Sequence, residues 1–316
     1  MNQPKKISVV VPFYNEGAGI THFYREITSI LDGLSHCHFE LVCVDDGSTD
    51  DTLIQLIELS KVDARVQVIE FSRNFGKEAA LTAGIDFASG DAVIPIDADL
   101  QDPPELISKM IALWNDGAEV VLAKRVDRSS DSALKRITAS AFYRLHNYLS
   151  SEAVIPENVG DFRLMDRVVI DALKRLPERQ RFMKGLFAWV GFKTVTLEYS
   201  RSARIAGETK FSGWRLWNFA IEGITSFSLI PLKIWTYLGV VGAVFAFFYA
   251  LFVIIRTLIF GIDLPGYASL LVVSLFFGSL QLISLGILGE YIGRIYFESK
   301  HRPLYIVRKS HGQASG

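Results

Sequence analysis

The apolar residues of this chain follow two patterns, one in each half of the sequence. In the first half, short β-rich apolar runs alternate with segments of helical spacing. The runs are 7–11, 39–44, 66–71, 92–96 and 120–123, and the helical segments lie around 18–34, 50–60, 77–88 and 103–116. Strands that are apolar almost throughout are typical of a sheet covered on both faces. The alternation predicts a doubly wound α/β domain that binds ligands beyond the carboxyl ends of its strands.

The second half contains two stretches without a charged side chain, 22 residues at 234–255 and 26 residues at 264–289. A helix of roughly 20 apolar residues crosses the hydrocarbon core of a bilayer. Two buried helices of a large soluble core are the alternative, but soluble helices rarely run so long without a charge. We therefore predict transmembrane helices at about 234–256 and 266–292.

Basic residues flank these stretches on both sides, whereas Arg256 alone lies between them. Because cations accumulate on the cytoplasmic side, we expect the α/β domain and both termini in the cytoplasm. Tryptophan, isoleucine and phenylalanine recur at helical spacing just before the first stretch, which favours an amphipathic juxtamembrane helix over a core-facing one. The predicted boundaries are 1–211 for the α/β domain, 212–232 for this helix, 233–293 for the membrane helices and 294–316 for a cytosolic tail.

The composition suits a chain that is partly in contact with lipid. It has 316 residues, 50% of them hydrophobic, with a mean hydropathy of +0.26 and a formal net charge of −1. This charge gives no support for a nucleic-acid partner, and Cys37 and Cys43 alone indicate no disulfide framework. The apolar run at 7–11 is too short for a signal peptide, so we expect a cytosolic N-terminus.

Polar residues follow the first three predicted strands. A Pro-Phe-Tyr-Asn-Glu run at 12–16 follows the first, and the second ends in Asp45 and Asp46, which suit hydrogen bonds from a base or a ribose. Ser48 or Thr49 is expected to cap the next helix. Lys77 follows a glycine but lacks the other residues of a phosphate loop, so it either reaches a phosphate or simply begins a surface helix.

The fourth strand is followed by Asp97, Asp99 and Asp102. Three carboxylates within six residues repel one another, and a divalent cation with oxygen ligands relieves that repulsion. Such a cation also neutralises a departing diphosphate. The alternative is a solvated acidic turn in which Asp102 caps a helix that begins at Pro103.

Two later segments carry further candidate residues. Asp161 lies at an expected glycine turn, and Arg204 and Lys210 belong to a cationic, glycine-containing segment before the juxtamembrane helix. Cations at membrane level suit an anionic lipid headgroup or the phosphates of a soluble ligand, and they also serve topology alone.

The order of these motifs resembles the family 2 glycosyltransferases of the GT-A fold. Within them the chain is most similar to the bacterial polyprenyl-phosphate glycosyltransferases, which include the bactoprenol glucosyltransferases of prophage O-antigen modification clusters and have dolichol-phosphate mannose synthase as a relative. The matching segments are 11–16, 45–48, 73–77, 97–102, 159–163 and 204–210. The expected fold class is therefore α/β: a GT-A (doubly wound, Rossmann-like) catalytic domain plus an interfacial helix and a two-helix transmembrane hairpin.

The resemblance implies roles for individual residues. Those expected to bind the nucleotide are Pro12, Tyr14, Asn15, Glu16, Asp45, Asp46, Lys77 and Asp97. Those expected to hold Mg²⁺ or Mn²⁺ against the diphosphate are Asp97, Asp99 and Gln101. Those expected to grip phosphates of the donor or the lipid are Arg125, Arg136, Arg204 and Lys210. Asp99 and Asp161 are the expected catalytic residues, with Asp161 either a base or a group that positions the acceptor.

The implied reaction is inverting transfer of one sugar, most simply glucose, from a UDP-sugar to undecaprenyl phosphate at the cytoplasmic face of the bacterial inner membrane. UDP-N-acetylhexosamine, UDP-galactose and an aminoarabinose donor are alternatives, and so is a membrane-anchored protein that binds nucleotide sugars without turnover. The chain lacks the Gln-x-x-Arg-Trp motif of processive synthases, which favours a single transfer. Two spans with exposed apolar faces indicate a homo-oligomer, and the resemblance adds a downstream flippase as a partner.

Overall fold

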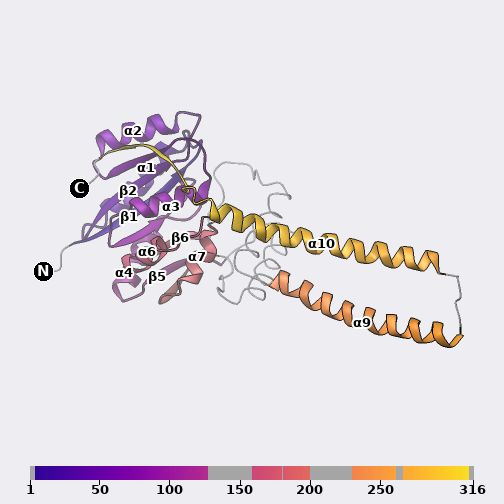
Figure 1. Cartoon of the computed structure of the whole chain (residues 1–316). Coiled ribbons are helices and arrows are strands. Elements are labelled where there is room, and N and C mark those ends of the chain that lie inside the picture. The colour runs from indigo at the N-terminus through magenta and orange to yellow at the C-terminus, as the bar shows by residue number, and fades with distance from the viewer. Residues whose placement is uncertain (1–3, 127–158, 180, 200–229, 261–265, 313–316) are drawn as a thin grey trace.

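The computed structural model of the chain describes residues 4–126, 159–179, 181–199, 230–260 and 266–312. It consists of an α/β domain from which two long helices project (Figure 1). The predictions on Arg136, Arg204 and Lys210 lie outside the described residues, as does most of the predicted juxtamembrane helix.

Within the described residues, one eight-stranded sheet forms the centre of the domain, in the order β7-β5-β6-β4-β1-β2-β3-β8. The strands are β1 (Lys5–Phe13), β2 (Cys37–Asp45), β3 (Val66–Phe71), β4 (Ala92–Pro95), β5 (Val120–Arg125), β6 (Val159–Asp166), β7 (Thr194–Tyr199) and β8 (Val307–His311). Strands β1 to β4 run parallel, whereas β6 is antiparallel to β4 and β5, and β8 is antiparallel to β3. The five strands predicted from apolar runs are confirmed to within a few residues.

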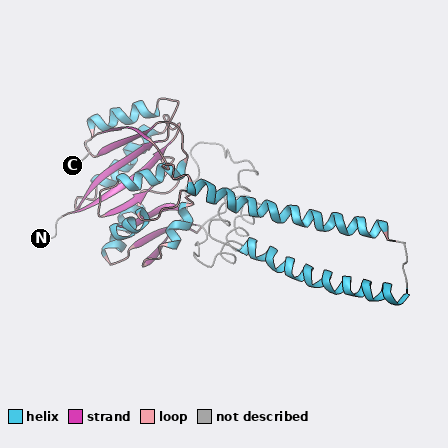
Figure 2. Cartoon of the chain, viewed as in Figure 1, coloured by secondary structure: helices cyan, strands magenta, loops and turns pink. Residues whose placement is uncertain are grey.

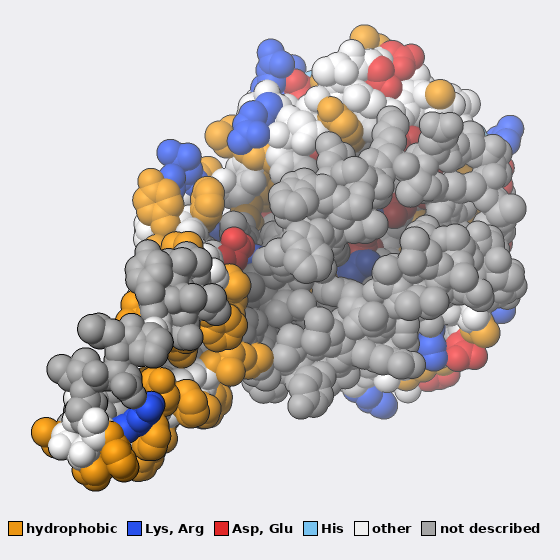
Figure 3. Space-filling view, turned by 90° about the vertical axis from the view of Figure 1, so that its right-hand side faces the viewer, with side chains coloured by type: hydrophobic (Ala, Val, Ile, Leu, Met, Phe, Trp, Pro, Cys, Tyr) orange, Lys and Arg blue, Asp and Glu red, His pale blue; other side chains and the backbone are white. Residues whose placement is uncertain are grey.

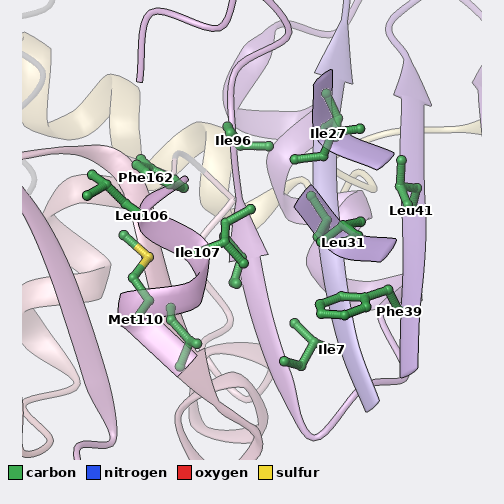
Figure 4. Packing of buried hydrophobic residues seen from close by; sticks show 14 of the residues in the cluster. Ile7, Ile27, Leu31, Phe39, Leu41, Ile96, Leu106, Ile107, Met110 and Phe162 are labelled. Atoms are coloured by element: carbon green, nitrogen blue, oxygen red, sulfur yellow. The ribbon is translucent and has the colours of Figure 1, made fainter. Parts of the chain in front are cut away.

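Helices cover both faces of this sheet, as the sequence predicts (Figure 2). They are α1 (Ile20–Asp32), α2 (Thr52–Val62), α3 (Lys77–Phe87), α4 (Leu106–Asn115), α6 (Arg167–Lys174) and α7 (Met183–Trp189). Alternate residues of a strand point to opposite faces, so Ile7 and Val9 pack in the cluster under α1 and α4, while Val10 packs in the cluster under α3. Figure 4 shows Ile27 of α1 and Ile107 of α4 in the first cluster.

The segment around Asp161 corrects one prediction. It is not a glycine turn but part of β6, and Gly160 does not adopt the left-handed backbone conformation. The strand is held by pairing with β4 on one side and with β5 on the other, for example Val93 with Met165 and Leu122 with Arg163. These contacts place Asp161 beside the end of β4, where the acidic residues begin.

The two long helices, α9 (Ile230–Phe260) and α10 (Tyr267–Ser299), lie side by side away from the sheet (Figure 1). Exposed hydrophobic side chains cover their described surface (Figure 3). Among the described residues, one segment, Phe276–Ser299, is long and apolar enough to cross a membrane, with 24 residues and a mean hydropathy of 1.3. In α9 the corresponding apolar stretch, Tyr237–Tyr249, is shorter. The predicted pair of helices is therefore present, and length and composition support membrane crossing for one of them.

Residues 294–316, predicted as a cytosolic tail, include the end of α10 and strand β8 at the edge of the sheet. The ring of Tyr305 stacks on Phe71, with centroids 5.1 Å apart, and its hydroxyl donates to Asp86 at 2.8 Å. Glu70 of β3 pairs with His311 at 3.1 Å and with Arg308 at 3.4 Å. The chain thus returns from α10 to the α/β domain and is fastened there.

The Tyr305 anchor gives a testable expectation. Tyr305→Ala removes both the ring stack and the hydrogen bond to Asp86, so we expect the free energy of unfolding of the full chain to fall by about 1–3 kcal/mol. Tyr305→Phe keeps the stack and is expected to lose about 1 kcal/mol or less. Unfolding in denaturant and limited proteolysis after residue 300 measure both. Equal losses for the two variants would show that the ring contributes nothing.

Candidate active site

A cleft of about 450 Å³ opens at the carboxyl ends of the parallel strands, the place where open α/β sheets bind ligands. The residues that line it are Pro12, Phe13, Tyr14, Glu16, Asp46, Asn74, Gly76, Lys77, Ala80, Asp97, Ala98 and Asp99. Its volume lies in the range of small-molecule sites, about 300–1,000 Å³. Most of the residues predicted to bind the nucleotide are therefore together, and the loop before α3 contributes Asn74 and Gly76, which the sequence analysis did not single out.

Asn15 fastens two loops together outside this lining. Its backbone has a φ of +53°, its side-chain oxygen accepts from the Thr49 N–H at 2.8 Å, and its own N–H donates to the Ser48 hydroxyl at 3.0 Å. The prediction that Ser48 or Thr49 caps α2 is therefore wrong. The Thr52 N–H, in the first turn of that helix, donates instead to Asp50 at 3.0 Å.

Asp46 lines the cleft and binds the loop that precedes α3. It is buried, and its carboxylate accepts from the N–H groups of Phe75 at 2.7 Å and Gly76 at 2.9 Å, which fixes the loop before α3. Burial raises the pKa of Asp46, and these two hydrogen bonds oppose the rise. Asp46 therefore positions the loop that carries Lys77.

Asp45, next to it, is almost fully buried and lacks one partner. Its Oδ2 accepts from the Ser48 N–H at 3.3 Å, while its Oδ1 has no hydrogen-bond partner among the residues that the structure describes. Burial raises the pKa of this carboxyl, and the charge of nearby Glu70 adds to the rise. A buried acceptor without a donor costs about 1–3 kcal/mol, so a ligand N–H at this position would be stabilised.

Gly47 allows the two loops to meet, which leads to a second expectation. Its φ is +66°, and a Cβ atom there would lie 2.4 Å from the backbone carbon of Arg73. We expect Gly47→Ala to destabilise the fold by about 2–4 kcal/mol and to weaken nucleotide binding. Gly76→Ala is the matched control, since Gly76 also has a positive φ, +97°, but nothing within 4 Å. Thermal unfolding and titration with UDP test this, and equal effects of the two changes would rule out the steric explanation.

Lys77, the first residue of α3, is bound between two carboxylates. Its ammonium lies 2.6 Å from Asp97 Oδ1, 2.9 Å from Asp97 Oδ2 and 2.9 Å from Asp161 Oδ2. Burial alone would lower the pKa of Lys77, but the charges of Asp161 and Asp97 outweigh it and raise the pKa. Lys77 is therefore neither a free surface residue nor, in this state, available to a phosphate.

Asp161 has a strongly lowered pKa. Burial by itself raises its pKa, but the positive charges of Lys77, Lys184 and Arg163 together outweigh burial and hold the pKa at about 2. The guanidinium of Arg163 lies over the Phe187 ring at 4.1 Å and donates to the Gly160 carbonyl at 2.7 Å, which fixes the backbone beside Asp161. Asp161 is thus a rigid, charged carboxylate at neutral pH.

Glu78 is a neighbour that the sequence analysis missed. Burial, followed by the charge of Asp161, raises its pKa to about 7, and its carboxylate accepts from the Met183 N–H at 3.1 Å. No local motif marks this residue, because its environment comes from β6 and α7.

The loop after β4 positions the remaining acids. Gln101 donates from its backbone N–H to Asp99 at 3.1 Å and from its side-chain amide to the same carboxylate. Asp102 accepts from the Tyr199 hydroxyl, and α4 begins at Leu106, so the alternative in which Asp102 caps a helix beginning at Pro103 is wrong. Arg125, at the end of β5, reaches the same Tyr199 hydroxyl. Gln101 and Asp102 thus brace the loop that carries Asp99.

The residues present fit a divalent cation. Asp97 and Asp99 both line the cleft, and the ammonium bound by Asp97 shows that the position favours positive charge. In the part of the chain that the structure describes, no three His, Cys, Asp or Glu side chains converge as a metal site. Mg²⁺ typically takes one or two carboxylates and completes its shell with water and substrate phosphates, which agrees with this donor set.

Comparison with known proteins gives full-length relatives. The chain is 55% identical over 306 residues to the SfII prophage-derived bactoprenol glucosyl transferase of Shigella flexneri, covering 97% of this chain and 98% of the relative. It is 54% identical to a prophage bactoprenol glucosyl transferase homologue of Escherichia coli, covering 96% and 99%. It is 51% identical to an uncharacterized glycosyltransferase of Synechocystis, covering 96% and 94%.

Among solved structures, glucosyl-3-phosphoglycerate synthase from Mycobacterium tuberculosis matches with a TM-score of 0.47 and 22% identity over 70% of this chain and 78% of that chain. Residues 8–174 match the model of the family described as glycosyl transferase family 2. That range contains the cleft and β6, and the full-length relatives extend the match through α9 and α10. The chain therefore belongs to glycosyl transferase family 2 and is a glycosyltransferase.

Proposed function

We propose that this glycosyltransferase transfers one glucose from UDP-glucose to undecaprenyl phosphate at the cytoplasmic face of the bacterial inner membrane. The observation that carries the proposal is the meeting of Asp97, Asp99 and Asp161 beside one cleft, in a chain that also projects two long apolar helices. Relatives named for glucosyl transfer to bactoprenol, 52–55% identical over nearly the full length, support the choice of sugar and acceptor.

The donor nucleotide is proposed to bind against Pro12, Tyr14 and Glu16, which line the cleft. Asp45 is proposed to accept from the base once donor binding exposes its buried, unpartnered oxygen, since Asp45 does not itself line the cleft. The remaining predicted contacts, from Asn15 and Asp46, act through the loops that these residues fasten. A divalent cation, Mg²⁺ or Mn²⁺, held by Asp97 and Asp99 would neutralise charge on the leaving diphosphate. Gln101 serves this site by orienting Asp99.

The proposed reaction is an in-line displacement with inversion. A phosphate oxygen of the lipid attacks the anomeric carbon, the bond from that carbon to the UDP oxygen breaks, and UDP leaves with the bonding electrons. A phosphate monoester has a second pKa near 6, so at neutral pH it is largely the dianion and needs no base. The low pKa of Asp161, about 2, suits a carboxylate that stays charged and positions the acceptor rather than one that takes up a proton.

The membrane half is proposed to bring the acceptor to this cleft. Both α9 and α10 cross the bilayer in this proposal, with the α/β domain and both termini on the cytoplasmic side. Arg125, Arg136, Arg204 and Lys210 then grip phosphates near the membrane. The product is a lipid-linked sugar for cell-envelope glycan modification, such as that of O-antigen. A flippase then moves this lipid-linked sugar across the membrane. The exposed apolar surface of the two helices supports a homo-oligomer.

A transfer assay tests the proposal. Full-length protein in nanodiscs receives undecaprenyl phosphate, Mg²⁺ or Mn²⁺, and radiolabelled UDP-glucose, with UDP-galactose and UDP-N-acetylglucosamine in parallel. We expect label in a lipid-extractable product from UDP-glucose alone. Label from another donor would overturn the sugar assignment. Nucleotide binding with no lipid product from any donor would support a binding protein instead.

A further inference from the structure

We propose that Lys77 is an internal counter-cation that holds the divalent cation's place at Asp97 until the donor arrives, and then moves to the donor diphosphate. The proposal rests on the metal position given under the proposed function and adds an order to its loading. A metal ion alone must compete with the Lys77 ammonium for Asp97. When the nucleotide binds as well, Lys77 moves to its diphosphate and leaves Asp97 to the metal ion.

The contacts of the ammonium carry the first step. Lys77 Nζ contacts both carboxylate oxygens of Asp97, at 2.6 and 2.9 Å, and one oxygen of Asp161, at 2.9 Å. An ammonium has three N–H donors, and these contacts engage it with both carboxylates at once. They also occupy the oxygens of Asp97 that a metal ion requires, and two cations at this distance repel each other. Lys77 and a metal ion therefore compete for Asp97.

The charges around the ammonium explain why it rests there. Asp97, just after β4, and Asp161 of β6 contact it, and Glu78, the next residue of α3, adds negative charge. Asp99 adds a further carboxylate beside Asp97. Among the described residues, Lys184 and Arg163 also act on Asp161. Without Lys77, Asp97 and Asp161 would repel each other across the gap that it fills. In the absence of metal, a counter-cation at this position stabilises the site.

The Lys77 side chain can also reach a second position, in the cleft. Its side chain is 47% exposed and lines the cleft in which the donor is proposed to bind. Lys77 is the first residue of α3, directly after Gly76, and its ammonium is carried on a flexible four-carbon chain. A diphosphate in the cleft offers new anionic oxygens to this ammonium. Nucleotide binding therefore helps to vacate Asp97, and by linkage metal binding favours the nucleotide by the same factor.

The test measures Mn²⁺ binding to the full-length protein without donor or acceptor, by electron paramagnetic resonance of the free ion. We expect Lys77→Gln to bind Mn²⁺ about tenfold more tightly than the wild type, because the competing charge is gone. With UDP added, the gain in Mn²⁺ affinity that UDP produces should be about tenfold smaller in the variant. Lys61→Gln is the matched control, since Lys61 is an exposed lysine of α2 paired with Glu58, and it should equal the wild type.

Asp97→Asn in the same titration separates this inference from the proposed function. Loss of Mn²⁺ binding in Asp97→Asn with tighter binding in Lys77→Gln supports both. Loss in Asp97→Asn with unchanged or weaker binding in Lys77→Gln overturns the role of Lys77 alone. Undiminished Mn²⁺ binding in Asp97→Asn overturns the metal position and the inference with it. Should Lys77→Gln fail to fold, Lys77→Met, which keeps an unbranched apolar stem, undergoes the same titration.

Discussion

Asp97→Asn is expected to lower the turnover of glucosyl transfer by about 10³-fold or more, with the α/β domain still folded. The substitution keeps the size of the side chain but removes a charge from the carboxylate that lines the cleft and binds Lys77. The leaving diphosphate then loses a main source of charge neutralisation. The measurement is the initial rate at saturating donor and lipid, across a range of Mg²⁺ concentrations.

Asp116→Asn is a suitable control for this change. Asp116 follows α4, is exposed and lies outside the cleft, so the same loss of charge should leave the rate unchanged. A normal thermal unfolding curve for Asp97→Asn would exclude misfolding as the cause of its inactivity. A rate for Asp97→Asn within a few fold of the wild type, with the same dependence on Mg²⁺, would place the metal site elsewhere.

The sequence predicts those parts of the fold that have a local signal. Strands β1 to β5 are nearly continuous apolar runs, so each is visible without knowledge of its partner. Strand β6 contains Gly160, Asp161 and Arg163, and it is a strand because β4 and β5 pair with it on both sides. Strand β8 reads Val-Arg-Lys-Ser-His, mostly polar, and only its pairing with β3 gives it this structure.

The candidate site likewise has features that the sequence predicts and features that it does not. The rule that ligands bind beyond strand ends located many of the residues that line the cleft, among them Pro12 and Asp99, but not Asn74 or Gly76. It gave no information on contacts between distant positions, such as that of Lys77 with Asp161 or of Tyr199 with Asp102. For the same reason it did not separate Tyr14, which lines the cleft, from Asn15, which ties two loops together.

Asp161→Asn is expected to reduce turnover by about 10²-fold and to remove no inflection of its own from the rate–pH profile between about pH 5 and 9. An inflection due to Glu78 would move to lower pH, because the charge of Asp161 helps to raise the pKa of Glu78. The charges of Lys77, Lys184 and Arg163 hold the pKa of Asp161 at about 2 against the opposing effect of burial, and this value lies far below the range. A group that stays ionised throughout adds no inflection to the profile. The loss instead reflects a misplaced acceptor.

Stability gives an independent check with a defined sign. Because folding lowers the pKa of Asp161 from 3.8 to about 2, its ionised form stabilises the fold above about pH 4, and this contribution disappears as the pH falls through about 2. Asp161→Asn should therefore be less stable than the wild type at pH 7 and nearly equal to it near pH 2. Glu78→Gln is the comparison for the rate, since Glu78, with a pKa near 7, is the neighbour able to produce a neutral inflection. An inflection near pH 7 that vanishes in Asp161→Asn but persists in Glu78→Gln would instead make Asp161 a general base.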